Sequence, residues 1–155
     1  MKHEILFRAK RKDHGEWIES FTLFKPDQHL YMFKTAWGEI TYDLHYNITA
    51  ITRRKEPFFV EVIPETVGQY TGLTDKNGVK IFERDIVKKT EGIPSVKKVE
   101  FHENEAAFIA TWKIHRHELY DLLRAYTMPG RNDVEFFEVI GNIYDNPELL
   151  KGELK

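Results

Sequence analysis

The residue types best suited to chemistry gather in one short stretch, "TGLTDKNGVKIFERDIV", at residues 71–87. Four of its residues, Asp75, Lys76, Asn77 and Asp85, supply two carboxylates, an amine and an amide. Such a group would suit acid–base catalysis or a cation site. A calcium loop, however, continues with oxygen ligands at alternate positions and closes with a glutamate, and no such loop follows here.

Turn chemistry explains the same stretch better. Residues 75–78, Asp-Lys-Asn-Gly, are typical of a tight turn, because Asn and Gly tolerate a positive φ. Glu-Arg-Asp at residues 83–85 predicts a second turn between short apolar runs. We therefore predict no catalytic residue in the chain, and we interpret four residues as a structural turn motif: Asp75, Asn77, Gly78 and Asp85.

A metal or cofactor site is not predicted either. The His-x-His sequence at residues 115–117, followed by Glu118, would place two imidazoles on one face of a strand. It lacks a third ligand at a defined spacing, so we interpret it as a solvated loop or helix entry. His102 belongs to a predicted hairpin tip, where exposure explains it. The chain has no cysteine, which excludes thiolate metal sites and disulfides, and its one glycine pair, at residues 68–72, lacks the Lys-Ser/Thr of a phosphate loop.

Nucleic-acid binding has a candidate set in two lysine pairs, Lys88, Lys89, Lys97 and Lys98. Adjacent residues of a strand point to opposite faces, so each pair supplies about one lysine per face. The formal net charge is −2, which gives bulk electrostatic attraction to nucleic acid no support. We interpret most of these lysines as a solubilising surface and keep nucleic-acid binding as the alternative hypothesis.

Many short strands must position these residues. Aromatic residues make up 14% of the chain, which favours strands over a helical bundle. Alternating or β-branched apolar residues predict strands at residues 4–10, 16–24, 29–34, 38–44, 46–53, 57–63, 96–101, 107–112 and 135–144, with two more starting at Val79 and Ile86. Within the strand predicted at residues 135–144, Gly141 predicts a bulge or a close approach of the backbone.

Two helices interrupt this pattern. Apolar residues at i, i+3, i+4 and i+7 predict an inserted helix near residues 117–127. Asn-Pro at residues 146–147 predicts the start of a short C-terminal helix. The fold class is mainly β, between all-β and α+β, with a β-rich segment at residues 1–64 and a second domain at residues 65–155.

The location expected from composition is the cytosol. No apolar run reaches the roughly 20 residues that cross a bilayer, and the opening residues, "MKHEILFRAKRKDHGEW", lack the apolar centre of a signal peptide. We therefore expect a soluble protein without a membrane partner.

Three blocks of the sequence resemble the YopX family of phage and prophage proteins. They are "HEILFRAKRKDHGEW" at residues 3–17, "ETVGQYTGLTDKNGVKIFERDIV" at residues 65–87 and "EVIGNIYDNPELL" at residues 138–150. The resemblance implies a mainly-β protein, an SH3-like small barrel at residues 65–155 and an origin in a phage or prophage. It implies no activity and no catalytic residue.

One departure from the family pattern is Arg84, which stands where the family usually has glycine. A left-handed backbone would cost an arginine roughly 1 kcal/mol or more. We therefore expect the turn to be reshaped.

The function predicted from all of this is non-enzymatic binding or assembly, with an unknown protein partner or with further copies of the chain. Exposed strand edges and aromatic faces are the surfaces that such contacts use.

Overall fold

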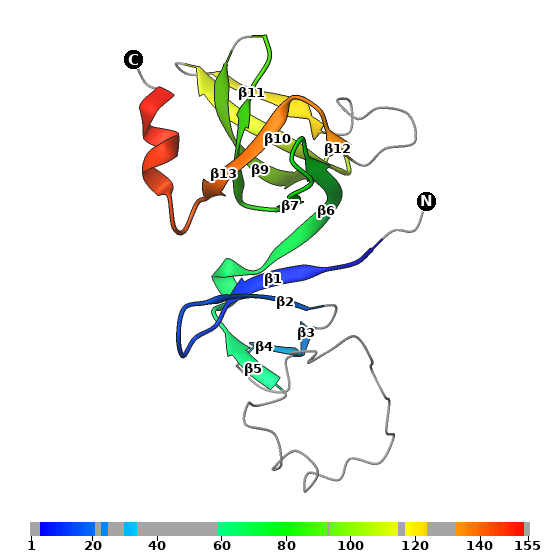
Figure 1. The fold of residues 1–155 in the computed structure, drawn as a ribbon, viewed down its shortest axis with the longest axis vertical. Coiled ribbons are helices and arrows are strands. Elements are labelled where there is room, and N and C mark those ends of the chain that lie inside the picture. The colour runs from blue at the N-terminus through cyan, green and yellow to red at the C-terminus, as the bar shows by residue number, and fades with distance from the viewer. Residues whose placement is uncertain are drawn as a thin grey trace, which may run out of the picture. The chain divides into compact units, whose positions relative to one another are not determined.

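The structure is a computed structural model of the chain, and it describes residues 4–20, 23–24, 30–33, 59–92, 94–114, 117–123 and 133–153. Over these residues the protein is mainly β, as predicted (Figure 1). It divides into two compact units, an N-terminal unit of Leu6–Val67 and a C-terminal unit of Gly68–Lys155 with Met1–Ile5. The predicted division lies between residues 64 and 65. The strands predicted at residues 38–44 and 46–53 fall outside the described residues.

The N-terminal unit contains a hairpin and a small sheet. Its elements are β1 (Phe7–Lys10), β2 (Trp17–Ser20), β3 (Leu23–Phe24), β4 (Leu30–Phe33), β5 (Phe59–Val62) and the 3₁₀ helix η2 (Pro64–Thr66). β1 pairs antiparallel with β2, and β4 lies between β3 and β5. An isolated bridge between Arg11 and Val62 connects the hairpin to the sheet. Strand alternation turns Ala9 inward, where it packs with Met32 and Val62 in a small core.

The described part of the C-terminal unit contains eight further strands. They are β6 (Gly68–Asp75), β7 (Lys80–Phe82), β8 (Asp85–Lys89), β9 (Ser95–His102), β10 (Ala107–Ile114), β11 (His117–Leu122), β12 (Asp133–Val134) and β13 (Phe137–Asn142), followed by the 3₁₀ helix η4 (Pro147–Glu153). β6 pairs with β7 on one side and with β12 on the other. The remaining strands form an antiparallel sheet in the order β11-β10-β9-β8-β13, and η4 lies against β9.

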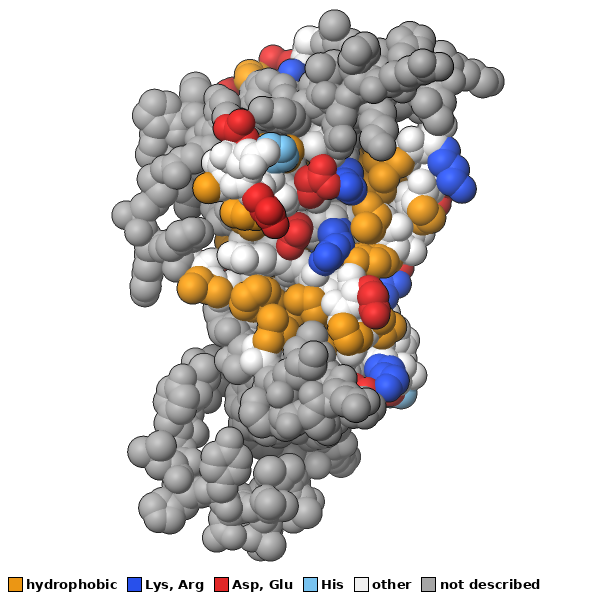
Figure 2. Space-filling view, turned by 180° about the vertical axis from the view of Figure 1, so that it is seen from behind, with side chains coloured by type: hydrophobic (Ala, Val, Ile, Leu, Met, Phe, Trp, Pro, Cys, Tyr) orange, Lys and Arg blue, Asp and Glu red, His pale blue; other side chains and the backbone are white. Residues whose placement is uncertain are grey.

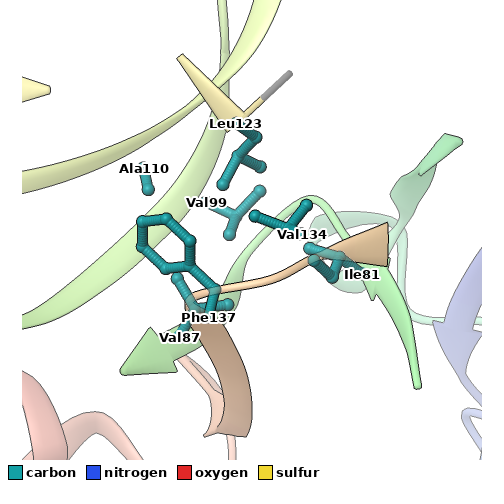
Figure 3. Close-up of a cluster of buried hydrophobic side chains, with 7 residues drawn as sticks. All are labelled: Ile81, Val87, Val99, Ala110, Leu123, Val134 and Phe137. Carbon is teal, nitrogen blue, oxygen red and sulfur yellow. The ribbon is translucent and has the colours of Figure 1, made fainter. Parts of the chain in front are cut away.

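One hydrophobic core holds these strands together. Figure 3 shows the side chains of Val99, Ala110 and Phe137 turned toward one another, with Ile81 and Val134 completing the cluster from β7 and β12. All of them are fully buried. The core thus joins the β6-β7-β12 strands to the five-stranded sheet, and burial of this apolar surface is the main stabilising term of the unit.

The helix predicted near residues 117–127 is wrong over residues 117–122, which form a strand. Residues 117–122 form β11, which pairs antiparallel with β10 from Ile114↔His117 to Ile109↔Leu122. The stretch "ELYDLL" fits both a helical repeat and an alternating one. The free backbone groups at the edge of β10 offer a complete ladder of hydrogen bonds, and this tertiary pairing outweighs the local helical pattern.

Two other fold predictions have a definite outcome. The short C-terminal helix exists as the 3₁₀ helix η4. The register of β13 shifts between Val139 and Gly141, so the bulge predicted at Gly141 is confirmed. No sheet closes on itself among the described strands, and the SH3-like barrel stays a prediction. Among the described residues, no helix has the length and apolar composition to span a membrane.

Candidate functional site

The β6–β7 turn contains the first of the candidate carboxylates, Asp75. One oxygen, Oδ1, accepts hydrogen bonds from the backbone N–H groups of Asn77 at 2.8 Å and Val79 at 2.9 Å. The other oxygen, Oδ2, accepts the backbone N–H of Val139 at 3.0 Å. The side chain is 1% exposed. Asp75 therefore organises its own turn and fastens that turn to β13, which lies far away in the sequence.

Two further residues of the motif, Asn77 and Gly78, complete this turn. Gly78 adopts a φ of +81° and donates its N–H to the carbonyl of Asp75 at 2.9 Å. Asn77 is exposed and enters the turn through its backbone. Lys76, the amine of the original group, forms an ion pair with Glu138 at 2.9 Å rather than with an aspartate.

The second corner lies between β7 and β8 and contains Asp85. Its Oδ2 accepts the backbone N–H of Phe82 at 2.7 Å, and the residue is 1% exposed. Arg84 adopts a φ of 70°, so its backbone is left-handed although glycine is absent, and the expectation of a reshaped turn is wrong at this residue. The Arg84 N–H donates to the carbonyl of Val99 at 2.7 Å, and its carbonyl accepts from Ile143 at 3.1 Å. These two bonds hold the backbone in a conformation that an arginine would otherwise avoid.

A glycine makes room for this corner. A Cβ on Gly68 would lie 2.6 Å from the carbonyl oxygen of Glu83, closer than real Cβ atoms approach. The neighbouring Gln69 carbonyl accepts the Glu83 N–H at 2.8 Å. The start of β6 and the second corner therefore touch along their backbones.

The third corner follows β13. Asn142 Oδ1 accepts the N–H groups of Tyr144 and Asp145, both at 3.0 Å, and its Nδ2 donates to Asp145 at 2.9 Å. A Cβ on Gly141 would collide with Oδ1 of Asn146. The block "EVIGNIYDNPELL" thus contains a glycine and two asparagines that fold the chain back toward η4.

At the comparable corner of the N-terminal unit, ion pairs supplement the backbone hydrogen bonds of the turn. Arg11 donates from Nε and Nη2 to the two carboxylate oxygens of Asp13, at 2.9 and 2.6 Å. These hydrogen bonds lower the pKa of Asp13 from its ordinary 3.8 to about 2. Lys12 pairs with Glu61 of β5 at 2.6 Å. The charged side chains at this corner therefore stabilise a turn, as the polar side chains do at the other three corners.

The four candidate lysines do not form one surface. Lys97 is 1% exposed, and its Nζ lies 5.9 Å from the centre of the Phe137 ring. Lys98 lies on the opposite face and pairs with Glu100. Lys88 is exposed and stands across from Glu138 in the register of β8 and β13, while Lys89 is half-buried. The face drawn in Figure 2 likewise mixes acidic, basic and hydrophobic side chains.

Two features emerge that the sequence analysis did not single out. The first is a set of exposed large hydrophobic residues, all in the C-terminal unit: Ile5 (59% exposed), Val79 (48%) and Phe101 (47%). The second is Trp17 in the β1–β2 hairpin, whose ring lies 4.8 Å from the Arg8 guanidinium and 5.4 Å from Lys10 Nζ. Lys10 pairs directly with Trp17 in the register of β1 and β2, so the two strands predicted there were a signal for this cluster.

No metal centre forms within the part of the chain that the structure describes, because no three His, Asp or Glu side chains there come together as ligands. Glu103 and Glu105 are exposed at the β9–β10 hairpin, whereas His102 ends β9 and is half-buried, so the exposure predicted for His102 is wrong. The other histidine candidate, at residues 115–117, includes positions outside the described residues.

Comparison with known proteins supports the sequence resemblance. The family described as YopX protein matches residues 6–151. No curated protein matches the chain. Among solved structures, the crystal structure of protein EF1440 from Enterococcus faecalis is similar with a TM-score of 0.43 and 22% identity, over 96% of this chain and 99% of that chain.

Proposed function

This chain belongs to the YopX family, and on that premise we propose that it is a non-enzymatic binding or assembly protein of a phage or prophage, acting in the host cytosol. Its partner is another protein or a further copy of the chain. The role of the aspartates supports this proposal. The carboxylates that acid–base chemistry would need, those of Asp75 and Asp85, accept backbone N–H groups within buried turns. Their oxygens stabilise the turns.

The observation that carries the proposal is the exposure of large hydrophobic side chains. Phe101, at 47%, and Val79, at 48%, project from the C-terminal unit into solvent. Aromatic residues are enriched at protein interfaces. A surface of this kind gains free energy when a partner covers it.

The finer fold assignment belongs with this proposal. We infer that the C-terminal unit is an SH3-like small barrel, because its core takes Ile81 from one group of strands and Val99 and Phe137 from the other. An experimental structure with a continuous ring of strand pairing would support the assignment. A permanently open sandwich would overturn it.

Self-assembly is tested by multi-angle light scattering on a sizing column over a wide concentration range. The expected result for an assembly protein is a mass that rises with concentration toward a defined multiple of 18.4 kDa. A strict monomer at high concentration would overturn self-association and leave a different protein as the partner.

Accessory nucleic-acid binding is the second candidate, and one observation favours it. Arg8 and Lys10 flank the ring of Trp17, and an aromatic ring with cations beside it is the kind of platform on which bases stack. Fluorescence anisotropy with single- and double-stranded DNA and RNA across a salt series tests this candidate. Binding that weakens steeply with salt supports it, and loss of that binding in Trp17→Ala locates it. No binding at low salt rejects it.

A further inference from the structure

The β6–β7 turn contains the chain's only Asn-Gly pair, Asn77 and Gly78. In such a pair the backbone nitrogen of the glycine can attack the side-chain amide of the asparagine, because glycine has no Cβ to crowd its own nitrogen. Asn77 is exposed, and a Cβ built on Gly78 would meet no atom within 4 Å. The reacting groups therefore lie in open space that water can reach.

The turn holds these two reacting groups differently. Within the described residues, Asn77 is held through its backbone N–H, which donates to Asp75 Oδ1 at 2.8 Å, and its side-chain amide makes no hydrogen bond. The Gly78 N–H donates to the carbonyl of Asp75 at 2.9 Å. The group to be attacked is thus free, whereas the attacking nitrogen is occupied as long as the turn is closed. Opening of the turn should therefore control the reaction.

The other asparagines of the described part of the chain are less suited to this chemistry. Asn104 is exposed at the β9–β10 hairpin, but a glutamate follows it, and the side chain of that glutamate crowds the attacking nitrogen. Both polar atoms of the Asn142 side chain are hydrogen-bonded. Asn146 precedes Pro147, which has no backbone N–H. Asn104 therefore serves as an exposed internal reference.

From this geometry we propose that Asn77 is a deamidation site whose reaction is controlled by the β6–β7 turn. The Gly78 nitrogen gives its proton to a solvent base and bonds to Cγ of Asn77. The bond from Cγ to the side-chain nitrogen breaks, and that nitrogen takes up a proton and leaves as ammonia. The product is a cyclic succinimide. Water then opens the ring at the side-chain carbonyl to give aspartate, or at the main-chain carbonyl to give isoaspartate, and no oxidant or reductant is needed.

Isoaspartate would change the turn itself, because it adds one carbon to the backbone between residues 77 and 78. The bonds that Gly78 and Val79 donate to Asp75 depend on the normal spacing. The other oxygen of Asp75 accepts the N–H of Val139 in β13 at 3.0 Å. A reaction in an exposed turn would thus loosen a buried contact far away in the sequence. It needs no partner, so it is independent of the proposed binding role.

The test follows the full chain during incubation in neutral buffer. Mass spectrometry of peptides, with fragmentation that tells isoaspartate from aspartate, is expected to show conversion at Asn77 before Asn104. Unfolding the chain in urea should speed conversion at Asn77 by ~10-fold or more, because the hydrogen bonds of the turn no longer hold the Gly78 nitrogen. Conversion of Asn104 first, or equal rates at Asn77 in the folded and unfolded chain, would overturn the proposal.

Two variants at the same position separate the reaction from its effect on the fold. Asn77→Gln keeps an exposed amide but would have to close a larger ring, so the turn should release no ammonia over the same period. Asn77→Asp supplies the aspartate product with a normal backbone, and it should melt close to the wild type. The isoaspartate form, purified from aged protein, should melt about 5 °C lower or more, because turn hydrogen bonds are lost. An isoaspartate form that melts with fresh protein would overturn the loosening of the turn.

Discussion

The turns of the two units are held by different kinds of contact. In the N-terminal unit, the corner after β1 depends on ion pairs, Arg11 with Asp13 and Lys12 with Glu61. In the C-terminal unit, corners depend on buried carboxylate and amide oxygens that accept backbone N–H groups, as Asp75 and Asn142 do. An ion pair with a solvent-exposed partner, as Asp13 is, contributes little and is screened by salt, whereas an unsatisfied buried N–H is costly. Mutation should therefore damage the C-terminal corners most, and solution conditions should act mainly on the N-terminal corner.

The largest expected effect is that of Asp75→Ala. Three backbone N–H groups, those of Asn77, Val79 and Val139, would lose their acceptor. We expect the free energy of unfolding to fall by about 3 to 5 kcal/mol, measured by urea denaturation. Asp75→Asn keeps an acceptor for the turn but presents an amide to Val139, and it should lose less. A loss below about 1 kcal/mol in Asp75→Ala would contradict the comparison.

A smaller loss is expected from Gly68→Ala. The new Cβ would meet the carbonyl oxygen of Glu83 at 2.6 Å, and the backbone of the second corner would have to move. We expect a loss of about 2 to 3 kcal/mol in thermal or chemical unfolding. Gly78→Ala is the control, because φ is +81° there but no atom lies near the added Cβ, and only the backbone strain of about 1 kcal/mol should appear. Equal losses at the two glycines would mean that the close approach is unimportant.

A gain is expected at the second corner from Arg84→Gly. The φ of 70° is strained for arginine and relaxed for glycine, while glycine adds disorder to the unfolded chain. The net gain should be about 0.5 to 1 kcal/mol in the free energy of unfolding. Arg84→Ala keeps the strain and should show no such gain. If alanine stabilises as much as glycine, the arginine side chain and not the backbone is responsible.

The smallest effect is expected in the N-terminal unit, from Asp13→Asn. The hydrogen bonds from Arg11 hold the pKa of Asp13 at about 2, below its ordinary 3.8, so the ion pair stabilises the folded state above pH 3.8. That contribution is lost as the pH falls from about 4 through 2. The stability difference between wild type and Asp13→Asn should therefore vanish at low pH and shrink in high salt. A difference that persists at pH 2 would mean that Asp13 acts through its shape, not its charge.

At the C-terminal corners, contacts between neighbours in the sequence could be predicted, whereas contacts with distant residues could not. The turn at residues 75–78 depends on neighbours in the chain, so its composition was sufficient to indicate it. The bond from Val139 to Asp75 spans 64 positions, and no single sequence reveals such a contact. The bulge at Gly141 could be predicted, because a glycine inside a strand indicates one. Its close contact with Asn146 could not be predicted from the glycine alone.

The same distinction explains the misplaced helix and the lysine set. Residues 117–122 became β11 because β10 offered a pairing edge, which local periodicity does not encode. Alternation correctly separated Lys97 from Lys98, but only the packing of Phe137 shows that Lys97 turns into the core. The exposure of Phe101 escaped prediction for a similar reason, because a strand pattern does not show where a core ends.

The burial of Lys97 has a practical consequence. An amine-reactive reagent in water should modify exposed Lys88 quickly and reach Lys97, at 1% exposure, only in molecules whose C-terminal unit has opened. Both lysines belong to neighbouring strands of one sheet, so a single mass-spectrometric digest would compare a surface amine with an interior one. The ratio of the labelling rates of the two lysines therefore reports how often that unit unfolds, without any added probe.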